Sequence, residues 1–302
     1  MDAKKILLAG GSGFTGKLLS QYLASHGYEV RILSREPRGE KDFFWNPVKE
    51  EIDEKALDGV TCVINLSGAS IAGKRWGRKR KQEIVNSRIQ STDCLYEKLR
   101  TAKHNVDTFI SASGTGYYGN HNSEWLDEVS PPAGGFLSNC CKYWEESAAK
   151  VSTLGIRTVI FRIGIVLSGE GGALPKFALP IKLFVGAPLG NGKQFISWIH
   201  YADFCALFLK AVEDKSMNGI YNAVAPEPET NRAFMKVLAQ TLKRPMFLPP
   251  VPSFVLRLML GEMATALTSS ERASCKKIMD AGFRFQFPQL EGALKNIYPE
   301  NL

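Results

Sequence analysis

Near its N-terminus the chain reads Lys5-Ile6-Leu7-Leu8-Ala9-Gly10-Gly11-Ser12-Gly13-Phe14-Thr15-Gly16. The apolar run predicts a short strand, and the glycines predict a turn that leads into a helix beginning at Phe14. Glycine lets a turn adopt positive φ and lets the backbone approach a ligand, so the N–H groups of this turn can reach a pyrophosphate. Strand, turn, helix and a second strand follow in the order of a dinucleotide-binding Rossmann fold. We expect cofactor contacts from Gly10, Gly11, Ser12, Gly13, Phe14, Thr15 and Gly16.

The second predicted strand, residues 28–33, ends at Ser34 and Arg35. An NAD enzyme usually places an acidic side chain here, because a carboxylate accepts a hydrogen bond from the ribose 2′-hydroxyl. Arg35 cannot accept a hydrogen bond, but its guanidinium can bind a 2′-phosphate, with Ser34 as a second donor. The pair therefore predicts NADP(H) rather than NAD(H) as the cofactor. A solvated arginine is the alternative.

Composition limits the class of protein. A chain of 302 residues with 44% hydrophobic content can bury a large core. No apolar run approaches the roughly 18 residues of a membrane span, and the first apolar run is too short for a secretion signal. The six cysteines show neither metal-ligand spacing nor the density of a disulfide framework. We therefore expect a soluble cytoplasmic protein with no membrane partner and no bound metal.

The densest basic run is Lys74-Arg75-Trp76-Gly77-Arg78-Lys79-Arg80-Lys81, in a chain of net charge +8. Such a run can bind nucleic acid, but this one has a single aromatic residue, has no repeat and leads into a predicted amphipathic helix over residues 82–100. A solvated helix start is favoured, and contact with phosphates of cofactor or substrate is the second interpretation. We expect no nucleic-acid partner.

Strands and helices alternate through most of the chain, with further strands predicted at residues 60–66, 108–112 and 157–162. This alternation predicts an α/β protein built on a Rossmann-fold doubly wound parallel sheet. From Gly169 the sequence becomes rich in glycine and proline, which indicates a smaller C-terminal substrate lobe. We expect residues 1–168 to form the NADP-binding domain, which also receives residues from about 195 to 225. Residues 169–194 and 226–302 would form the lobe.

Ligands of such sheets bind beyond the carboxyl ends of the strands, so the residues there are candidate site residues. The run Ser67-Gly68-Ala69 would let a cofactor lie close to the backbone. Ser113, which follows the strand over 108–112, could polarise a substrate oxygen. An ordinary strand-end cap is the alternative for Ser113.

Further motifs extend through the whole chain: Val63-Ile64-Asn65-Leu66-Ser67-Gly68, Lys74-Arg75-Trp76, Asn86-Ser87-Arg88-Ile89, Gly116-Tyr117-Tyr118-Gly119, Trp198-Ile199-His200 and Gly282-Phe283-Arg284-Phe285. Together with the glycine turn, they resemble the extended or atypical short-chain dehydrogenase/reductases, and within these the YfcH-like epimerase family proteins. The resemblance implies an NADP(H)-binding fold with a lobe similar to that of sugar-nucleotide epimerases and the family's C-terminal domain. It also implies cofactor contacts from Leu66, Ser67, Gly68, Glu83, Arg88 and Val166. Glu83 would accept from adenine or a ribose hydroxyl, or hold Arg88.

The superfamily's reaction depends on a Tyr-x-x-x-Lys pair one helical turn apart, in which the phenol transfers the proton. None of the nine tyrosines in this chain is followed four residues later by lysine. The aligned positions hold Cys141 and Glu145. A carboxylate one turn away would raise the pKa of the Cys141 thiol, which makes Glu145 a poor substitute for lysine. Tyr117 and Tyr118 are candidate acids, with packing against the C-terminal lobe as their alternative.

Two classes of function remain. The first is an NADP(H)-dependent oxidoreductase or epimerase that acts on a small phosphorylated or nucleotide-linked substrate. Its candidate catalytic residues are Ser113, Tyr117, Tyr118 and Cys141. The second is a catalytically silent NADPH-binding regulatory protein whose cofactor sets the closure of the lobe. We favour the first, and both must explain an intact cofactor turn beside a missing proton-transfer pair.

Overall fold

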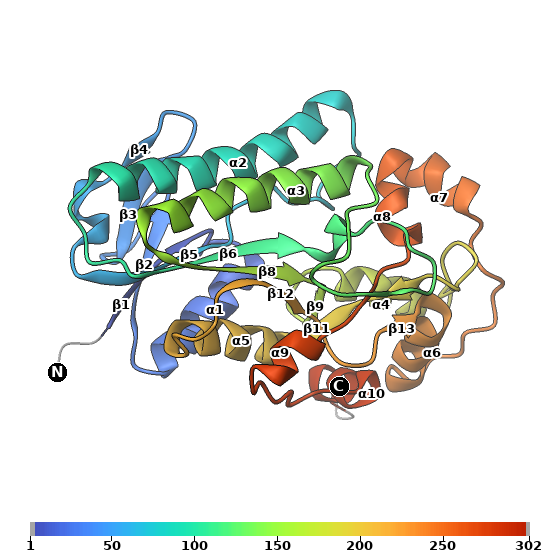
Figure 1. Cartoon of the computed structure of the whole chain (residues 1–302). Coiled ribbons are helices and arrows are strands. Elements are labelled where there is room, and N and C mark those ends of the chain that lie inside the picture. The colour runs from blue at the N-terminus through green and yellow to red at the C-terminus, as the bar shows by residue number, and fades with distance from the viewer. Residues whose placement is uncertain (1–3, 300–302) are drawn as a thin grey trace.

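The computed structural model describes residues 4–299, and its centre is an eight-stranded sheet of order β12-β8-β6-β5-β1-β2-β3-β4 (Figure 1). Its strands are β1 (Lys5–Ala9), β2 (Glu29–Ser34), β3 (Asp42–Asn46), β4 (Glu51–Ile52), β5 (Val60–Asn65), β6 (Thr108–Gly114), β8 (Arg157–Ile163) and β12 (Gly219–Ala223). Neighbouring strands run parallel, except that β4 is antiparallel to β3. The predicted doubly wound parallel sheet is confirmed. Its strand order reverses between β1 and β5, which is where such sheets bind ligands.

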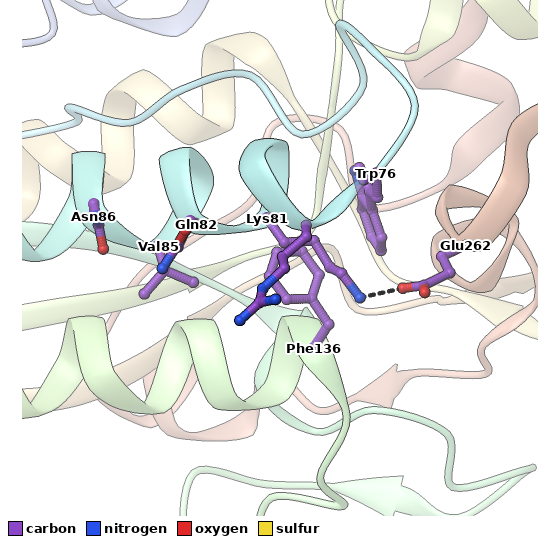
Figure 2. A pocket seen from close by; sticks show the side chains of 9 residues that line it. Trp76, Lys81, Gln82, Val85, Asn86, Phe136 and Glu262 are labelled. Atoms are coloured by element: carbon purple, nitrogen blue, oxygen red, sulfur yellow. Dashed lines mark hydrogen bonds and ion pairs between the residues drawn. The ribbon is translucent and has the colours of Figure 1, made fainter.

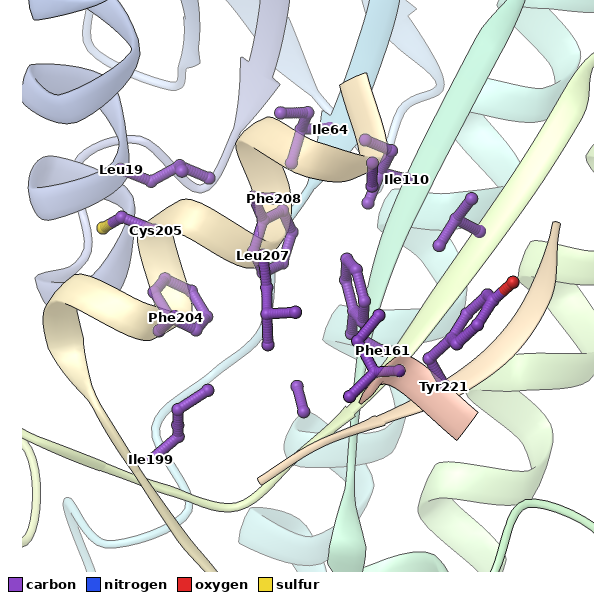
Figure 3. Packing of buried hydrophobic residues seen from close by; sticks show 14 of the residues in the cluster. Leu19, Ile64, Ile110, Phe161, Ile199, Phe204, Cys205, Leu207, Phe208 and Tyr221 are labelled. Atoms are coloured by element: carbon purple, nitrogen blue, oxygen red, sulfur yellow. The ribbon is translucent and has the colours of Figure 1, made fainter. Parts of the chain in front are cut away.

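Helices cover both faces of the sheet (Figure 1). On one face lie α1 (Phe14–Ser25) and α5 (Tyr201–Glu213), and on the other lie α2 (Arg78–Thr101) and α3 (Phe136–Ala149). The alternation of β1 explains this: Ile6 and Leu8 pack with the α1 and α5 side, whereas Leu7 and Ala9 pack with the α2 and α3 side. Figure 3 shows the first of these two cores. Because it is buried on both faces, β1 is apolar at all four of its buried positions, Ile6 to Ala9.

The strands β3 and β4, the last two on one side of the sheet, were not expected from the sequence. β3 pairs with β2 over only three residues, and β4 pairs with β3 over two. Neither segment alternates apolar and polar residues, and Phe44 in β3 is exposed. Pairing with the adjacent strand, rather than a local pattern, makes them strands.

A separate core forms the C-terminal lobe. It contains Trp198 of β11 (Trp198–His200), Phe177 of α4 (Leu174–Lys182), Phe234 of α6 (Asn231–Thr241) and Leu294 of α10 (Leu290–Ile297). The other elements here are β9 (Ile165–Leu167), β10 (Phe195–Ile196), β13 (Glu229–Thr230), α7 (Ser253–Leu260), η4 (Gly261–Ala264) and α8 (Thr265–Thr268). β9 pairs with β11 and β10 pairs with β13, so short strand pairs organise the entry to the lobe.

The chain crosses between the sheet and the lobe several times. After the lobe begins, α5 and β12 return to the main sheet. Later, β14 (Arg272–Ala273) pairs with β7 (Trp125–Leu126), and α9 (Lys276–Asp280) follows. Ala273, Ile278 and Phe283 pack into the core beneath the main sheet. The segment 273–283, which the expected boundary gives to the lobe, thus lies against the sheet.

Within residues 4–299, no helix combines the length and the apolar character needed to cross a bilayer. All six cysteines are buried and free.

Candidate functional site

The turn between β1 and α1 has the geometry of a phosphate cradle. Gly10 has φ +84°, and a Cβ on it would lie 2.8 Å from the carbonyl carbon of Leu66. A Cβ on Gly16 would lie 2.1 Å from the carbonyl oxygen of Gly10. The helix α1 has no side-chain cap at Gly13 and no acidic residue in its first turn. Its first backbone N–H groups are therefore left for an anion, and the turn fits the pyrophosphate of a dinucleotide.

The segment after β5 forms a wall beside this turn. Ser67 is buried, and its hydroxyl has no hydrogen-bond partner among the residues that the structure describes. Arg88 on α2 donates to the carbonyl oxygen of Ala69 at 3.1 Å, and a Cβ on Gly68 would lie 3.0 Å from its Cζ. The structure thus brings Leu66, Ser67, Gly68 and Arg88 together, and the unpartnered Ser67 hydroxyl suits a polar ligand.

Glu83 is exposed, and its ion-pair partner is Arg80. Its carboxylate pairs with Arg80 at 2.7 Å, and that contact lowers its pKa. Arg88 instead lies over the ring of Trp144, with 5.0 Å from its Cζ to the ring centroid. Glu83 therefore pairs with Arg80, which precedes Glu83 by one turn of α2.

The end of β2 presents an unpaired cation. Arg35 is exposed and makes none of the side-chain hydrogen bonds or ion pairs found within the described part of the chain. The Ser34 hydroxyl accepts from the backbone N–H of Glu36 at 3.1 Å, so its own hydrogen is free to donate. Both groups can bind a phosphate.

Two further expected contacts meet where the lobe begins. Val166 lies in β9, opposite Ile199 of β11. The ring of Phe14 packs so closely that a Cβ on Gly171 would lie 2.6 Å from it. Gly172 lies against both, since its Cβ would be 3.1 Å from the Phe14 ring and 3.4 Å from the Val166 carbonyl oxygen. The cofactor turn and the first loop of the lobe are therefore in direct contact.

The basic run before α2 holds the C-terminal segment in place. Arg75 donates to the carbonyl oxygen of Leu258 in α7 at 2.8 Å. Lys81 forms an ion pair with Glu262 of η4 beside an open cavity of about 470 Å³, which Trp76 also lines (Figure 2). Part of this run is thus not a solvated helix start, because its cations dock α7 and η4 onto α2.

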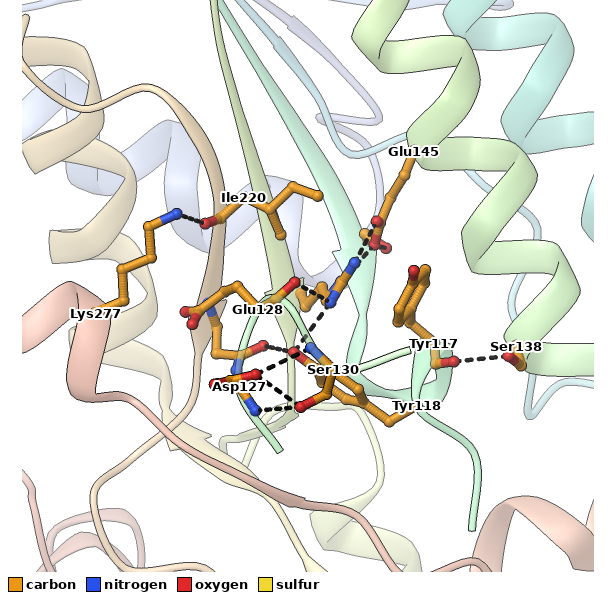
Figure 4. Close-up of polar contacts among 12 residues, drawn as sticks. Tyr117, Tyr118, Asp127, Glu128, Ser130, Ser138, Glu145, Ile220 and Lys277 are labelled. Atoms are coloured by element: carbon orange, nitrogen blue, oxygen red, sulfur yellow. Dashed lines mark hydrogen bonds and ion pairs between the residues drawn. The ribbon is translucent and has the colours of Figure 1, made fainter. Parts of the chain in front are cut away.

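A buried ion pair occupies the place of the missing proton-transfer pair (Figure 4). Arg162 at the end of β8 binds both carboxylate oxygens of Glu145 on α3, at 2.9 and 2.8 Å, and is only 2% exposed. The Ser113 hydroxyl donates to the same carboxylate at 2.7 Å. Since its only hydrogen is engaged there, Ser113 as placed offers a substrate oxygen no hydrogen bond.

The two tyrosines differ in their surroundings. Tyr118 is fully buried, donates to Asn222 at 2.7 Å and accepts from Arg162 at 3.1 Å. Burial raises the pKa of Tyr118 to about 12, although Arg162 opposes this. Tyr118 therefore lies in the interior. Tyr117 is partly buried, with its ring against the guanidinium of Arg162 at 3.4 Å.

Cys141 lies beneath the end of β6. A Cβ on Gly114 would be 3.7 Å from its sulfur. Burial raises the pKa of the Cys141 thiol to about 12, and the charges of Glu145 and Glu271 raise it as well. The expected effect of Glu145 thus has the right direction, but burial is the larger cause. A thiol with this pKa is a poor acid or base near neutral pH.

Sequence reasoning missed Glu271, a partly buried acid between α8 and β14. It lines a small cavity of about 70 Å³ together with Thr115, Phe177, Ser197, Asn231 and Ser269. Burial raises the pKa of Glu271 to about 7, and a hydrogen bond with Thr115 opposes the rise. No motif marks this residue, because the cavity joins segments that lie far apart in the sequence.

Glu271 should make folding stability depend on pH. The carboxyl keeps its proton up to about pH 7 when folded but loses it near its ordinary value of 4.5 when unfolded. The unfolding free energy should therefore fall as pH rises from about 4.5 to 7, by on the order of 1–3 kcal/mol. Urea unfolding at pH 5 and pH 8 checks this. The decline should be smaller in Glu271→Gln, and an equal decline in both proteins would contradict it.

Comparisons with known proteins agree with this geometry. The model of the NAD dependent epimerase/dehydratase family matches residues 6–223, and a domain of unknown function, DUF1731, matches residues 251–297. The chain is 35% identical over 299 residues to the epimerase family protein SDR39U1 of Mus musculus, covering 97% of this chain and 99% of that protein. It is 38% identical over 297 residues to the epimerase family protein YfhF of Bacillus subtilis, covering 97% of each.

The solved structure of the human epimerase family protein SDR39U1 with NADPH is also similar. Its TM-score is 0.90 at 32% identity, and the match covers 99% of this chain and 100% of that one. That protein was solved with the cofactor that Arg35 predicts for this chain. The resemblance expected from the motifs is confirmed: the chain belongs to the NAD dependent epimerase/dehydratase family, among relatives called epimerase family proteins.

Proposed function

We propose that this protein binds NADP(H) and acts as an oxidoreductase or sugar-nucleotide epimerase on a small anionic substrate, phosphorylated or nucleotide-linked. The observation that carries the proposal is the unpaired, exposed Arg35 at the end of β2, beside a glycine turn with no room for a Cβ. The NADPH in the human relative's structure supports the choice of cofactor. The net charge of +8 supports an anionic substrate.

Both phosphate-bearing parts of the cofactor have residues that would hold them. The N–H groups at the start of α1 would bind the pyrophosphate, and Arg35 with Ser34 would bind the 2′-phosphate. The wall from Leu66 to Gly68 would let the ligand lie against the backbone, with the Ser67 hydroxyl as a hydrogen-bond partner. When bound, the dinucleotide supplies or accepts a hydride.

The buried ion pair favours a second candidate function, that of a catalytically silent NADPH-binding regulatory protein. Ser113, Glu145 and Arg162 satisfy one another, so these three polar groups bind no substrate as placed. The contact of Phe14 with Gly171 would then couple the bound cofactor to the position of the lobe.

Calorimetric titration with NADPH and NADH tests the cofactor assignment. We expect NADPH to bind more tightly, and Arg35→Ala to lose about 10- to 100-fold of NADPH affinity, because a charge-assisted contact to phosphate is lost. NADH affinity should not change. Arg38→Ala is the matched control, since Arg38 is also exposed and pairs with Glu36 at 3.2 Å. Equal binding of both cofactors, or an equal loss in both variants, would sink the NADP(H) assignment.

Hydride transfer separates the two candidate functions. Protein with bound NADPH or NADP⁺ is incubated with a panel of sugar nucleotides, phosphorylated sugars and simple carbonyl compounds. Oxidation or reduction of the nicotinamide, or formation of an epimer, would support the enzyme. Tight cofactor binding with no exchange across the panel would favour the regulatory protein.

A further inference from the structure

The Cys141 thiol at the usual proton-transfer position is a poor acid, but a carboxyl group of the lobe lines a cavity beside the end of β6. Cys141 lies under Gly114 at the end of β6, and Thr115 is the next residue. Glu271 and Thr115 line the same cavity. A carboxyl group from the C-terminal lobe thus approaches the end of the strand that carries Ser113.

The backbone of Glu271 is fixed on both sides. Its N–H donates to the carbonyl oxygen of Phe195 at 3.2 Å, and its carbonyl oxygen accepts from the Ser197 hydroxyl at 2.7 Å. The next residue, Arg272, begins β14, and its guanidinium lies 4.6 Å from the Phe195 ring centroid. A fixed backbone holds the side chain in one orientation, which proton transfer requires.

The side chain of Glu271 lines a cavity, and it takes part in none of the ion pairs found among residues 4–299. Its neighbours there are uncharged: Thr115 from η2 (Thr115–Tyr117), Ser197 between β10 and β11, Asn231 from α6 and Ser269 from its own segment. The charge of Glu271 also raises the pKa of the Cys141 thiol on α3. With a pKa of about 7, a carboxyl in such surroundings is partly protonated near neutral pH, whereas Glu145 is engaged by Arg162.

From this geometry we infer that Glu271 is the acid and base of the reaction, delivered by the lobe in place of the tyrosine that α3 lacks. The inference rests on the proposed function and names the residue that moves the proton. The substrate group that it would serve is a carbonyl oxygen, or in the other direction a hydroxyl, at the mouth of the Thr115 cavity.

The proton balance is simple. In reduction, the O–H bond of the Glu271 carboxylic acid breaks and the proton goes to the carbonyl oxygen, while the carbonyl carbon gains the hydride that the dinucleotide supplies. Glu271 is left as a carboxylate, which regains a proton from water. In oxidation, the carboxylate takes the hydroxyl proton as the carbon loses its hydride. The pKa of about 7 suits both directions, because acid and carboxylate are both populated near neutral pH.

The test uses oxidised NADP⁺ as a probe and needs no substrate. Oxidised nicotinamide carries a positive charge, which lowers the pKa of a nearby carboxyl and expels its proton. If the pKa falls by one unit from about 7, binding at pH 7 should release about 0.4 of a proton. Calorimetry in two buffers of different ionisation enthalpy measures this release. NADPH, whose ring is uncharged, should release almost none.

Glu271→Gln should bind NADP⁺ within about threefold of the wild-type affinity but lose the proton release. Glu291→Gln, on an exposed carboxyl of α10 in the same lobe, should keep the release. If Glu271→Gln does not fold, the difference in proton release between NADP⁺ and NADPH binding to the wild type still tests the inference. Normal NADP⁺ binding with no proton release that depends on Glu271 overturns this inference and leaves the proposed function standing. Failure of the wild type to bind NADP⁺ or NADPH overturns the proposed function itself.

Discussion

Replacing Gly16 by alanine is expected to abolish measurable NADPH binding, with a loss of at least about 100-fold in affinity. The new Cβ would lie 2.1 Å from the carbonyl oxygen of Gly10 and 2.7 Å from the Cα of Gly11. Both are backbone atoms, so neither can rotate away as a side chain would. The turn must open, and the N–H groups at the start of α1 would no longer converge on one phosphate. The same crowding should lower the unfolding free energy by about 1–3 kcal/mol.

Calorimetric titration with NADPH and thermal unfolding measure the two effects. Gly13→Ala gives a graded comparison, because its Cβ would be 3.3 Å from the same oxygen of Gly10 and should cost less affinity. Gly292→Ala in α10 is the control, since no atom lies within 4 Å of its added Cβ. NADPH affinity of Gly16→Ala close to that of the wild type would mean that the pyrophosphate does not lie over this turn.

Replacing Arg162 by methionine should lower the unfolding free energy by about 3–5 kcal/mol. The change fills most of the volume but leaves Glu145 as a buried carboxylate that has lost two hydrogen bonds. It also removes a donor to the Tyr118 hydroxyl. The cost arises from the unpaired charge more than from the lost attraction, so adding Glu145→Gln to this variant should recover part of the loss.

Chemical denaturation of the single and double variants gives these free energies. Arg100→Met is the matched control, because Arg100 also pairs with a glutamate, Glu97, but its side chain is 52% exposed. That variant should lose less than about 1 kcal/mol. A similar loss of unfolding free energy in Arg162→Met and Arg100→Met would show that burial does not increase the contribution of the Arg162–Glu145 pair to stability.

The sequence predicted the parts of this protein that local patterns determine. The glycine turn and the strands β1, β2, β5, β6 and β8 depend on apolar runs and on glycines at fixed offsets, and both can be read in one segment. The strands β3 and β4 depend on their neighbours, and the sequence did not reveal them. Cofactor contacts could be proposed from the sequence because most of the expected residues follow the ends of these strands directly.

The chemistry was harder to predict because it depends on distant pairs. Glu145 could be assigned to the proton-transfer helix, but its partner Arg162 lies on another element, and only the packed structure joins them. Likewise, nothing near Glu271 in the sequence shows that it meets Thr115. Ser113 and Tyr118 were sensible candidates by position along the chain. Both are buried, and Ser113 donates its hydrogen to Glu145 while Tyr118 donates its hydrogen to Asn222. Neither hydroxyl is therefore free to act as an acid.

The repeated passage of the chain between sheet and lobe has a consequence for biosynthesis. The core beneath β12 and β8 is completed by Ala273, Ile278 and Phe283, which are synthesised after every strand of the main sheet. Until then, apolar side chains such as Phe161 and Tyr221 lack part of their cover (Figure 3). A nascent chain that has reached Ala223 would thus carry every strand of the main sheet and still expose an apolar, aggregation-prone face. Such an intermediate would be a substrate for chaperones, and this core would close only after the segment 273–283 has emerged from the ribosome.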